Sequence, residues 1–233
     1  KRPVINSVFS DFGGTLNDGK LYFASARNDR GKNYGWNQEP FLDLYAAVQN
    51  KDGSFQTPLP LETINTKYHE GLVSFSADGK TMYFSRESYF DKIFERDSLS
   101  RNKYSVLNLY KSSKDSGVWS KGEALSLNSE NYSVKNPAVS PDGKLLFFAS
   151  DMAGGMGKFD IYMAPINKDG SVGEPSNLGQ KLNTEGQEMF PFVSADNTLY
   201  FSSDGHLGLG GMDVFFTKLV DGKVGPIRNV GIP

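Results

Sequence analysis

The stretch NDGKLYFASAR, residues 17–27, decides the fold because close variants of it recur three times along the chain. The variants read ADGKTMYFSRE from Ala77, PDGKLLFFASD from Pro141 and ADNTLYFSSDG from Ala195. In three of the four copies an Asp-Gly pair supplies the positive φ angles that a tight hairpin turn needs between two apolar segments. A phrase that returns after roughly 50–65 residues indicates an array of similar structural units.

Two shorter phrases follow these copies in a fixed order. The first joins a polar residue to an aliphatic residue and a ring, as in Asp43-Leu44-Tyr45, Asn108-Leu109-Tyr110, Asp160-Ile161-Tyr162 and Asp213-Val214-Phe215. The second joins an aliphatic residue to Asn and a hydroxyl residue, as in Ile64-Asn65-Thr66, Leu127-Asn128-Ser129 and Leu182-Asn183-Thr184. Each unit then holds four short strands, and prolines mark the outer one, where a sheet edge tolerates them. The sequence therefore predicts an all-β fold, a β-propeller of four-stranded antiparallel blades.

The repeat also sets the expected domain organisation. Within a single domain that covers the whole chain, four blades are visible, at about residues 7–66, 67–129, 130–184 and 185–233. The chain begins at Lys1 without Met, and the phrase Ile5-Asn6-Ser7 lacks the strand that precedes such a phrase elsewhere. We therefore expect a fragment of a longer multidomain protein, and a parent ring of five or six blades is an open alternative.

The composition excludes several classes of function. With 25 Lys and Arg against 27 Asp and Glu, the net charge is −2. The chain therefore lacks the excess of basic residues with which proteins bind nucleic acid or an anionic membrane. There is no Cys and there are two His, so neither a thiolate nor a three-His zinc site can form. No apolar run is long enough for a spanning helix. Asp151 and Asp204 could offer oxygens to calcium, but nothing in their spacing requires it, so no metal and no cofactor are predicted.

The repeat carries a resemblance to a known family. Ser140-Pro141-Asp142-Gly143-Lys144, followed by Phe148–Asp151 and Asp160-Ile161-Tyr162, resembles the WD40-like repeat of TolB-type propellers. Residues 188–192, EMFPF, and residues 202–206, SSDGH, are similar to one group of such proteins in particular. That group is the OmpA-family envelope lipoproteins, which carry a propeller between TPR repeats and a peptidoglycan-binding OmpA-like domain.

The resemblance implies a location and a role. One member type of this family is the peptidoglycan-anchoring periplasmic subunit of the type IX secretion system. The implied location is the periplasm, in association with the outer membrane. The implied partners are other outer-membrane or periplasmic proteins. Peptidoglycan would be reached only through an OmpA-like domain that this sequence does not contain.

Glycine-rich segments at two equivalent places are interpreted as turns. A phosphate-binding loop needs a following helix N-terminus, whereas these segments precede the strand phrases that begin at Asp160 and Asp213. Each Asp is expected to accept turn N–H groups. The predicted structural turn residues are Asp142, Gly143, Gly154, Gly155, Asp160, Gly210, Gly211 and Asp213.

Two carboxylates stand apart from the repeat and are candidates for the central funnel. Glu70 and Glu188 lie a few residues after the Asn-Thr phrase, where the innermost strand is expected to begin. Propeller glycosidases place paired carboxylates in the funnel. No base–nucleophile partner is visible in the sequence, however, so we predict no catalytic residue and no enzyme.

Two long segments are the candidate partner-binding loops. Residues 28–41 and 89–107 are rich in aromatic residues, and such loops on a rigid scaffold are typical of protein-binding surfaces. Packing of each loop onto its own blade is an equally open interpretation. The candidate residues are Tyr34, Trp36, Tyr89, Phe90 and Phe94.

The repeat and the absence of a catalytic constellation predict a non-catalytic interaction or scaffold module. The family resemblance implies that this module is periplasmic and links a secretion machinery to peptidoglycan. A carbohydrate-binding or glycan-cleaving propeller and a passive spacer between flanking domains are the two alternatives.

Overall fold

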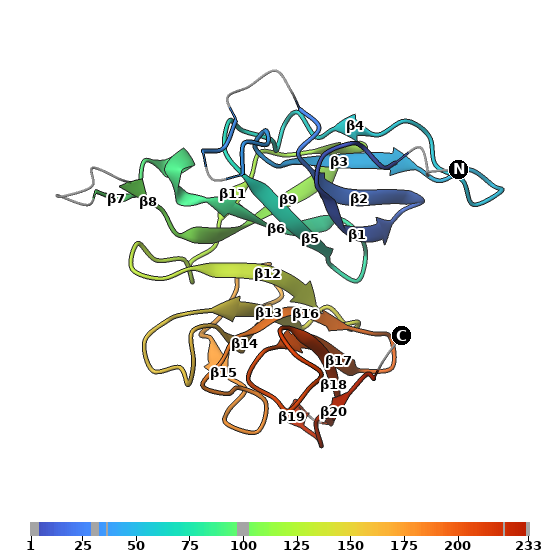
Figure 1. The fold of residues 1–233 in the computed structure, drawn as a ribbon. Coiled ribbons are helices and arrows are strands. Elements are labelled where there is room, and N and C mark those ends of the chain that lie inside the picture. The colour runs from blue at the N-terminus through green and yellow to red at the C-terminus, as the bar shows by residue number, and fades with distance from the viewer. Residues whose placement is uncertain (1–4, 29–32, 36, 97–102, 221, 232–233) are drawn as a thin grey trace.

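The structure is a computed structural model that describes residues 5–28, 33–35, 37–96, 103–220 and 222–231. It consists of four antiparallel sheets arranged as the four blades of a β-propeller, which confirms the predicted fold class (Figure 1). Blades 1 and 2, blue to green in Figure 1, lie above blades 3 and 4, which are yellow to red. The prediction of a larger parent ring stays a prediction.

Each blade runs in sequence order from an inner strand to an outer edge. Blade 1 holds β1 (Asp11–Asn17), β2 (Lys20–Ser25), β3 (Asp43–Val48) and β4 (Leu59–Pro60). Blade 2 holds β5 (Glu70–Phe75), β6 (Thr81–Glu87), β9 (Leu107–Asp115), β10 (Val118–Trp119) and β11 (Glu123–Ala124), the last two both pairing with β9. Blade 3 holds β12 (Val134–Val139), β13 (Leu145–Ser150), β14 (Asp160–Pro165) and β15 (Ser176–Asn177). Blade 4 holds β16 (Glu188–Val193), β17 (Thr198–Ser203), β18 (Asp213–Val220), β19 (Lys223–Val224) and β20 (Arg228–Asn229).

Blade 2 carries an insertion between its second and third strands. It contains a 3-10 turn, Ser88–Asp91, and a two-stranded sheet of β7 (Glu95–Arg96) and β8 (Lys103–Tyr104).

In blades 1, 2 and 3 the turn between the first two strands contains a glycine. Gly19, Gly79 and Gly143 adopt φ angles of 67°, 68° and 72°, which glycine reaches without strain. In blade 3 the Asp142 carboxylate accepts hydrogen bonds from Ser140 Oγ and the Lys144 N–H, at 2.6 and 3.1 Å. We call this end of the propeller the hairpin end. The opposite end, where the second strand leads to the third, is the loop end.

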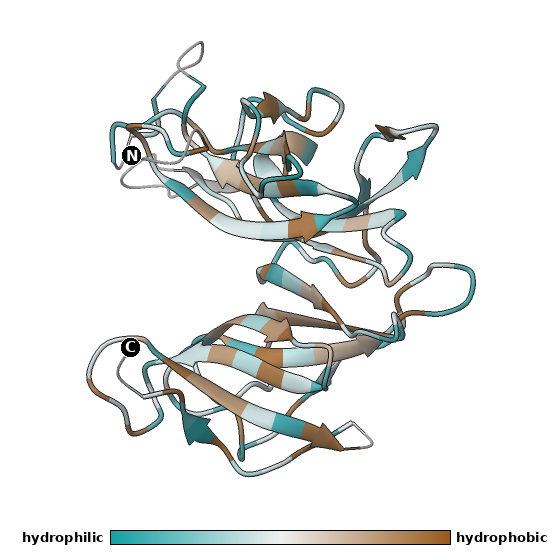
Figure 2. Cartoon of the chain, turned by 90° about the vertical axis from the view of Figure 1, so that its right-hand side faces the viewer, coloured by the Kyte–Doolittle hydropathy of each residue, from teal (hydrophilic) through white to brown (hydrophobic). Residues whose placement is uncertain are grey.

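The core lies between blades. Figure 2 shows apolar residues, in brown, along the strands of each sheet. Blade 2 packs on blade 1 through a cluster that includes Leu44 and Phe84, and blade 4 packs on blade 3 through one that includes Ile161 and Phe201. Burial of such side chains is the main stabilising contribution. The outward face of blade 4 differs, because Val214 is 46% exposed, whereas its counterparts Leu44 and Ile161 are fully buried.

A bulge in every inner strand shapes the central channel. The register between the first two strands shifts near Gly13, Leu72, Asn136 and Phe190. Asn136 and Phe190 both adopt a φ of 55°, in the left-handed region that Gly13 occupies at 71°. A bulge bends its strand and re-aims a side chain. Leu72, Asn136 and Phe190 line the channel beside the inner strands, and the Gly13 backbone borders it.

Candidate binding site at the loop end of the propeller

The structure places the two candidate funnel carboxylates inside the protein. The side chains of Glu70 and Glu188 are both 0% exposed. Glu70 accepts hydrogen bonds from the Thr66 N–H and hydroxyl, at 3.1 and 2.8 Å, and from Arg86 Nε at 2.9 Å. Burial raises the pKa of Glu70 to about 7, against the opposing charge of Arg86. Hydrogen bonds therefore occupy both oxygens of Glu70.

Glu188 is held in the same way. It accepts hydrogen bonds from the Thr184 N–H and hydroxyl at 2.8 and 2.7 Å, and from the Ser203 hydroxyl at 2.6 Å. In both blades the carboxylate binds the hydroxyl residue that follows the Asn of the closing phrase. This contact ties the end of one blade to the inner strand of the next.

The glycine-rich segments form turns that the third-strand Asp residues close. Asp160 accepts the N–H groups of Met156 and Gly157 at 2.6 and 3.1 Å. Asp213 accepts the N–H groups of Leu209 and Gly210 at 2.6 and 3.1 Å.

The predicted turn glycines lie in these same segments. Positive φ angles occur at Gly154 (90°), Gly210 (132°) and Gly211 (63°). At Gly155 a side chain would press on the Asp160 carboxylate, 2.8 Å from Oδ2. A strand follows each segment, so neither has the following helix that a phosphate-binding loop requires.

The two candidate partner-binding loops meet through a chain of aromatic rings. Tyr34 of the first loop packs edge-on against His69, with ring centroids 4.7 Å apart. Next to His69 in the chain, Tyr68 stacks on Tyr89 of the second loop at 5.5 Å, and Tyr89 contacts Phe94 at the same distance. The structure therefore joins two loops that the sequence presented separately.

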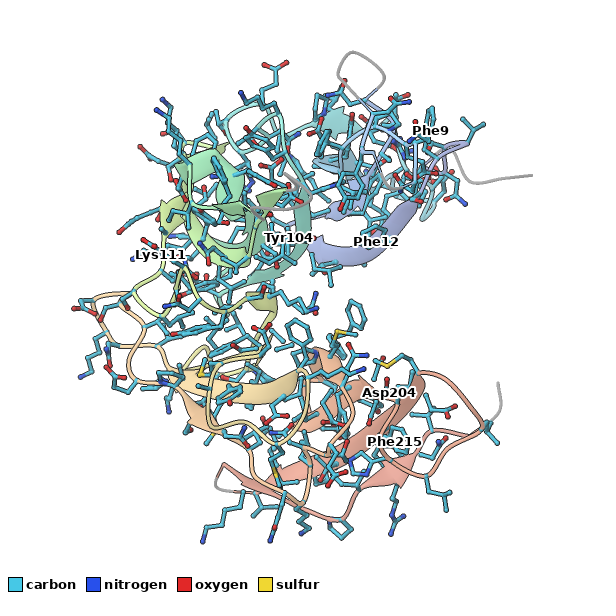
Figure 3. The ribbon with its side chains drawn as sticks, turned by 60° about the vertical axis from the view of Figure 1, so that its left-hand side comes forward. Phe9, Phe12, Tyr104, Lys111, Asp204 and Phe215 are labelled. Atoms are coloured by element: carbon cyan, nitrogen blue, oxygen red, sulfur yellow. The ribbon has the colours of Figure 1, made fainter. Side chains whose placement is uncertain are left out.

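The remaining candidate partner-binding residues are Phe90, Phe94 and Trp36. Phe90 is 49% exposed, and its ring lies 4.7 Å from the guanidinium carbon of Arg86, which fixes it in place. Phe94 and Tyr104 are 38% and 57% exposed. Trp36 lies outside the described residues. Figure 3 shows Tyr104 of blade 2 and Phe12 of blade 1, which line the same cavity.

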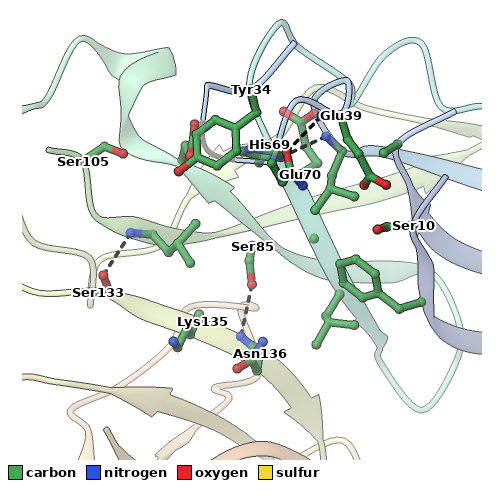
Figure 4. Close-up of a pocket in the computed structure, with 18 of the residues that line it drawn as sticks. Ser10, Tyr34, Glu39, His69, Glu70, Ser85, Ser105, Ser133, Lys135 and Asn136 are labelled. Atoms are coloured by element: carbon green, nitrogen blue, oxygen red, sulfur yellow. Dashed lines mark hydrogen bonds between the residues drawn. The ribbon is translucent and has the colours of Figure 1, made fainter. Parts of the chain in front are cut away.

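That cavity, which we call the mouth cavity, has a volume of about 590 Å³ and opens at the loop end of the channel (Figure 4). A second cavity of about 550 Å³ continues it along the inner strands, and the two share Asn136 and Phe190. The residues that line the mouth cavity include Tyr34, Glu39, Glu87, Tyr89, Lys135 and Asn136.

Polar atoms without partners concentrate at the mouth cavity. Among the described residues, four buried side-chain atoms have no hydrogen-bond partner, and three of them belong to residues that line it: Glu39 Oε2, Glu87 Oε2 and Asn136 Oδ1. Native proteins pair nearly all such atoms. Their concentration at one cavity marks it as the candidate site.

The electrostatics of the mouth cavity follow from burial. Burial raises the pKa of Glu87 to about 7, and it lowers the pKa of His69 to about 4. Nδ1 of His69 accepts the Leu42 N–H at 2.9 Å, so the neutral ring carries its proton on Nε2. Burial also lowers the pKa of Lys135, whose Nζ lies 3.4 Å from the ring centroid of Phe159.

The described residues contain no group of three or more His, Cys, Asp and Glu side chains that could hold a metal ion. No helix in that part of the chain is long and apolar enough to cross a membrane.

Sequence reasoning missed Glu39, Glu87 and Asn136, although two of them carry a signal. Glu87 follows the aromatic strand where blades 3 and 4 have Asp151 and Asp204, which accept the N–H groups of Ser133 and Gln187. A longer carboxylate at that place departs from the repeat. Asn136 stands where blade 1 has Gly13, and both residue types tolerate positive φ.

Comparison with known proteins supports the fold. No family model matches the sequence, and no curated protein matches it. Among solved structures, a TolB-type protein from Agrobacterium tumefaciens is 16% identical, with 97% of this chain and 82% of that chain covered at a TM-score of 0.50.

Two glycosidases share the fold as well. The GH43 β-xylosidase/α-arabinofuranosidase CoXyl43, from a compost microbial metagenome, is 14% identical, with 98% and 79% covered and a TM-score of 0.54. The α-L-arabinofuranosidase of Lactobacillus brevis is 13% identical, with 100% and 75% covered and a TM-score of 0.54. Other matched chains are much longer, and this chain spans 40% of TolB from Acinetobacter baumannii.

These structures correct one expectation. The prediction that the chain is not an enzyme is contradicted, because the fold is shared with glycoside-cleaving enzymes. The propeller architecture therefore does not separate this chain from catalysts.

Proposed function

We propose that this chain is the propeller of a periplasmic, outer-membrane-associated protein, and that it binds another envelope protein at its loop end. The observation that carries the proposal is the joined aromatic surface of blades 1 and 2. Phe90, Phe94 and Tyr104 are exposed there, beside a ring chain that holds the two loops together. Exposed rings on a fixed scaffold are characteristic of protein-binding surfaces.

Two observations support the location in the envelope. The repeat resembles that of OmpA-family envelope lipoproteins, including the peptidoglycan-anchoring subunit of the type IX secretion system. A TolB-type protein has the same fold. In this proposal the propeller holds a component of a secretion machinery, and a separate OmpA-like domain of the parent protein holds peptidoglycan.

The test is photo-crosslinking in cells. A photoreactive residue would replace Tyr104 at the loop end or, as a control, Lys168, which is exposed in the 167–170 turn at the hairpin end. We expect a discrete protein adduct at Tyr104 and none at Lys168, and we expect Phe90→Ala with Phe94→Ala to weaken the adduct. Equal adducts at both positions, or none at either, would overturn the proposal.

A second candidate function is favoured by the carboxylates of the mouth cavity. Glu39 and Glu87 both line it, beside Tyr34 and Tyr89. A carboxyl group whose pKa is about 7 suits a general acid at neutral pH. The candidate function is binding or cleavage of a glycan.

This candidate has a direct test. The purified chain would be incubated with xylo-oligosaccharides and with peptidoglycan fragments, and products and binding would be measured. Turnover or binding that Glu87→Gln abolishes would support the glycan function. No binding and no product with either glycan would exclude it for these substrates.

A further inference from the structure

We infer that the mouth cavity binds a primary ammonium group, carried by a lysine side chain, an amino terminus or a free amine. The inference deepens the proposed function and rests on it only for the source of the amine. It names the chemistry that the partner presents to the cavity.

The unpartnered atoms of the cavity are all hydrogen-bond acceptors. Glu39 comes from the long loop of blade 1, Glu87 ends β6 of blade 2, and Asn136 lies in the bulge of β12 in blade 3. A ligand that pairs them must therefore bring donors. A primary ammonium group carries only N–H donors and no acceptor, so it can pair with acceptors of this kind.

The protein does not supply the cation itself. In the described part of the chain, no Lys, Arg or His forms an ion pair with Glu39 or Glu87, and the nearby Arg86 pairs with Glu70 at 2.9 Å. Among the described residues that line the cavity, Lys135 is the one lysine or arginine, and its amine lies over the ring of Phe159. Burying a carboxylate without a cation is costly, so a bound cation would be stabilised here.

The walls of the cavity also suit a cation. Tyr34 and Tyr89 both line it, from blade 1 and blade 2 respectively. Aromatic faces attract ammonium groups. The neutral His69 ring, packed edge-on against Tyr34, adds no competing positive charge.

Asn136 is a pre-positioned part of the site. Its side chain is 8% exposed, and its left-handed backbone is fixed by the N–H bond to Ser85 Oγ at 3.1 Å. Figure 4 shows it below Glu39 and across the cavity from Tyr34. An anionic ligand would bring only further acceptors to this set.

The experiment uses a matched pair of probes on the purified chain. N-acetyl-L-lysine N-methylamide carries one ammonium on a flexible stem, and N-acetyl-L-norleucine N-methylamide keeps the stem without the charge. By calorimetry at pH 8 we expect the lysine probe to bind roughly tenfold more tightly, which is the scale of one cation–π contact combined with a charged hydrogen bond. Butylamine and triglycinamide, tested alongside, distinguish a free amine and an amino terminus from a lysine side chain.

Variants locate the binding. We expect Glu39→Gln and Glu87→Gln each to weaken the lysine probe roughly five- to tenfold, the scale for loss of one charge-assisted hydrogen bond. Asn136→Gly keeps the positive φ and removes the amide, and we expect it to weaken binding roughly threefold. Glu174→Gln, at an exposed position of blade 3, serves as the control and should bind as the parent does.

Two outcomes would overturn the inference: equal binding of the two matched probes, or unchanged binding in both carboxylate variants. Thermal unfolding of each variant shows whether it is folded, and Asn136→Gly provides a test of the site that leaves both carboxylates in place. The failure of this inference is separable from that of the proposed function. Probe binding is measured on the purified chain, whereas the adduct at Tyr104 is measured in cells.

Discussion

The segments that lead from the second to the third strand differ most between the two halves of the propeller. In blades 3 and 4 they are short, residues 151–159 and 204–212, and they close on themselves. Asp160 and Asp213, the first residues of the third strands, each accept two backbone N–H groups from these turns. Each carboxylate thus holds its own loop closed, and Asp160 also accepts a hydrogen bond from Asn177 Nδ2 of β15 at 2.7 Å.

In blades 1 and 2 the equivalent segments are long, and the side chain at the first position of the third strand makes fewer hydrogen bonds. Asp43 accepts a hydrogen bond from Asn28 Nδ2 at 2.7 Å, and burial raises its pKa. Asn108 is buried, and its Oδ1 has no partner. The loops instead contribute rings to a shared surface, and Glu39 of the first loop lines the mouth cavity together with Glu87 at the end of β6. One repeat therefore serves two purposes: closing a turn in one half, and building a site in the other.

The largest expected effect comes from replacing the Asp that closes the turn in blade 3. Asp160→Ala removes the acceptor of the Met156 and Gly157 N–H groups and of Asn177 Nδ2, and we expect a loss of about 3 kcal/mol in the free energy of unfolding. Asp43→Ala should cost less than about 1 kcal/mol, because that carboxylate is buried with little compensation. Urea denaturation at pH 7 measures both. Equal losses would contradict the comparison.

The next effect concerns His69, which lies between the two long loops. Its pKa is lowered to about 4, so the unfolded chain takes up a proton below about pH 6.5 while the folded chain does not. The stability that this group contributes is present above pH 6.5 and is lost as the pH falls towards 4.

The variant His69→Phe keeps the ring contacts and does not titrate. Relative to this variant, we expect the parent chain to lose about 2 kcal/mol of stability between pH 7 and pH 4.5, a figure reduced for partial exposure. Using the difference removes the opposite contribution of the carboxylates with raised pKa values. A difference that does not change with pH would show that His69 titrates normally.

The smallest effect concerns Glu87, which lines the mouth cavity. The pKa of Glu87 is raised to about 7, so its ionisation costs stability as the pH rises from about 4.5 through 7. We expect Glu87→Gln to be about 1–2 kcal/mol more stable than the parent at pH 8 and equal to it at pH 4.5. Glu174→Gln should change nothing at either pH. A destabilised Glu87→Gln at pH 8 would contradict the raised pKa, because favourable contacts such as the hydrogen bond from the His69 backbone would then outweigh the cost of burying the charge.

The fold could be predicted from the sequence because its determinants are local. The Asp142-Gly143 turn, the aromatic strand after it and the Asp160 phrase each specify one step of a blade, and their recurrence specifies the rest. The enzyme prediction failed for the same reason, because a repeat describes the scaffold and the scaffold is shared with catalysts.

The site could be predicted only in part. The two aromatic loops were identified, but their contact through Tyr68 and His69 depends on how blades 1 and 2 pack. The sequence indicates Glu70 as a candidate funnel residue. In the structure its carboxylate instead pairs with the hydroxyl and the N–H of Thr66, four residues earlier in the chain. Glu87 and Asn136 lie in different blades, and only the closed arrangement of the inner strands brings them to one cavity.

The loop end of blades 1 and 2 is the binding end that we propose for this propeller. It is tested most directly by a map of backbone amide chemical shifts while the lysine probe is added to the purified chain. We expect shifts that saturate at Tyr34, Glu87 and Asn136, with none in the 167–170 turn at the hairpin end. Shifts confined to the hairpin end or to the exposed face of blade 4 around Val214 would contradict it.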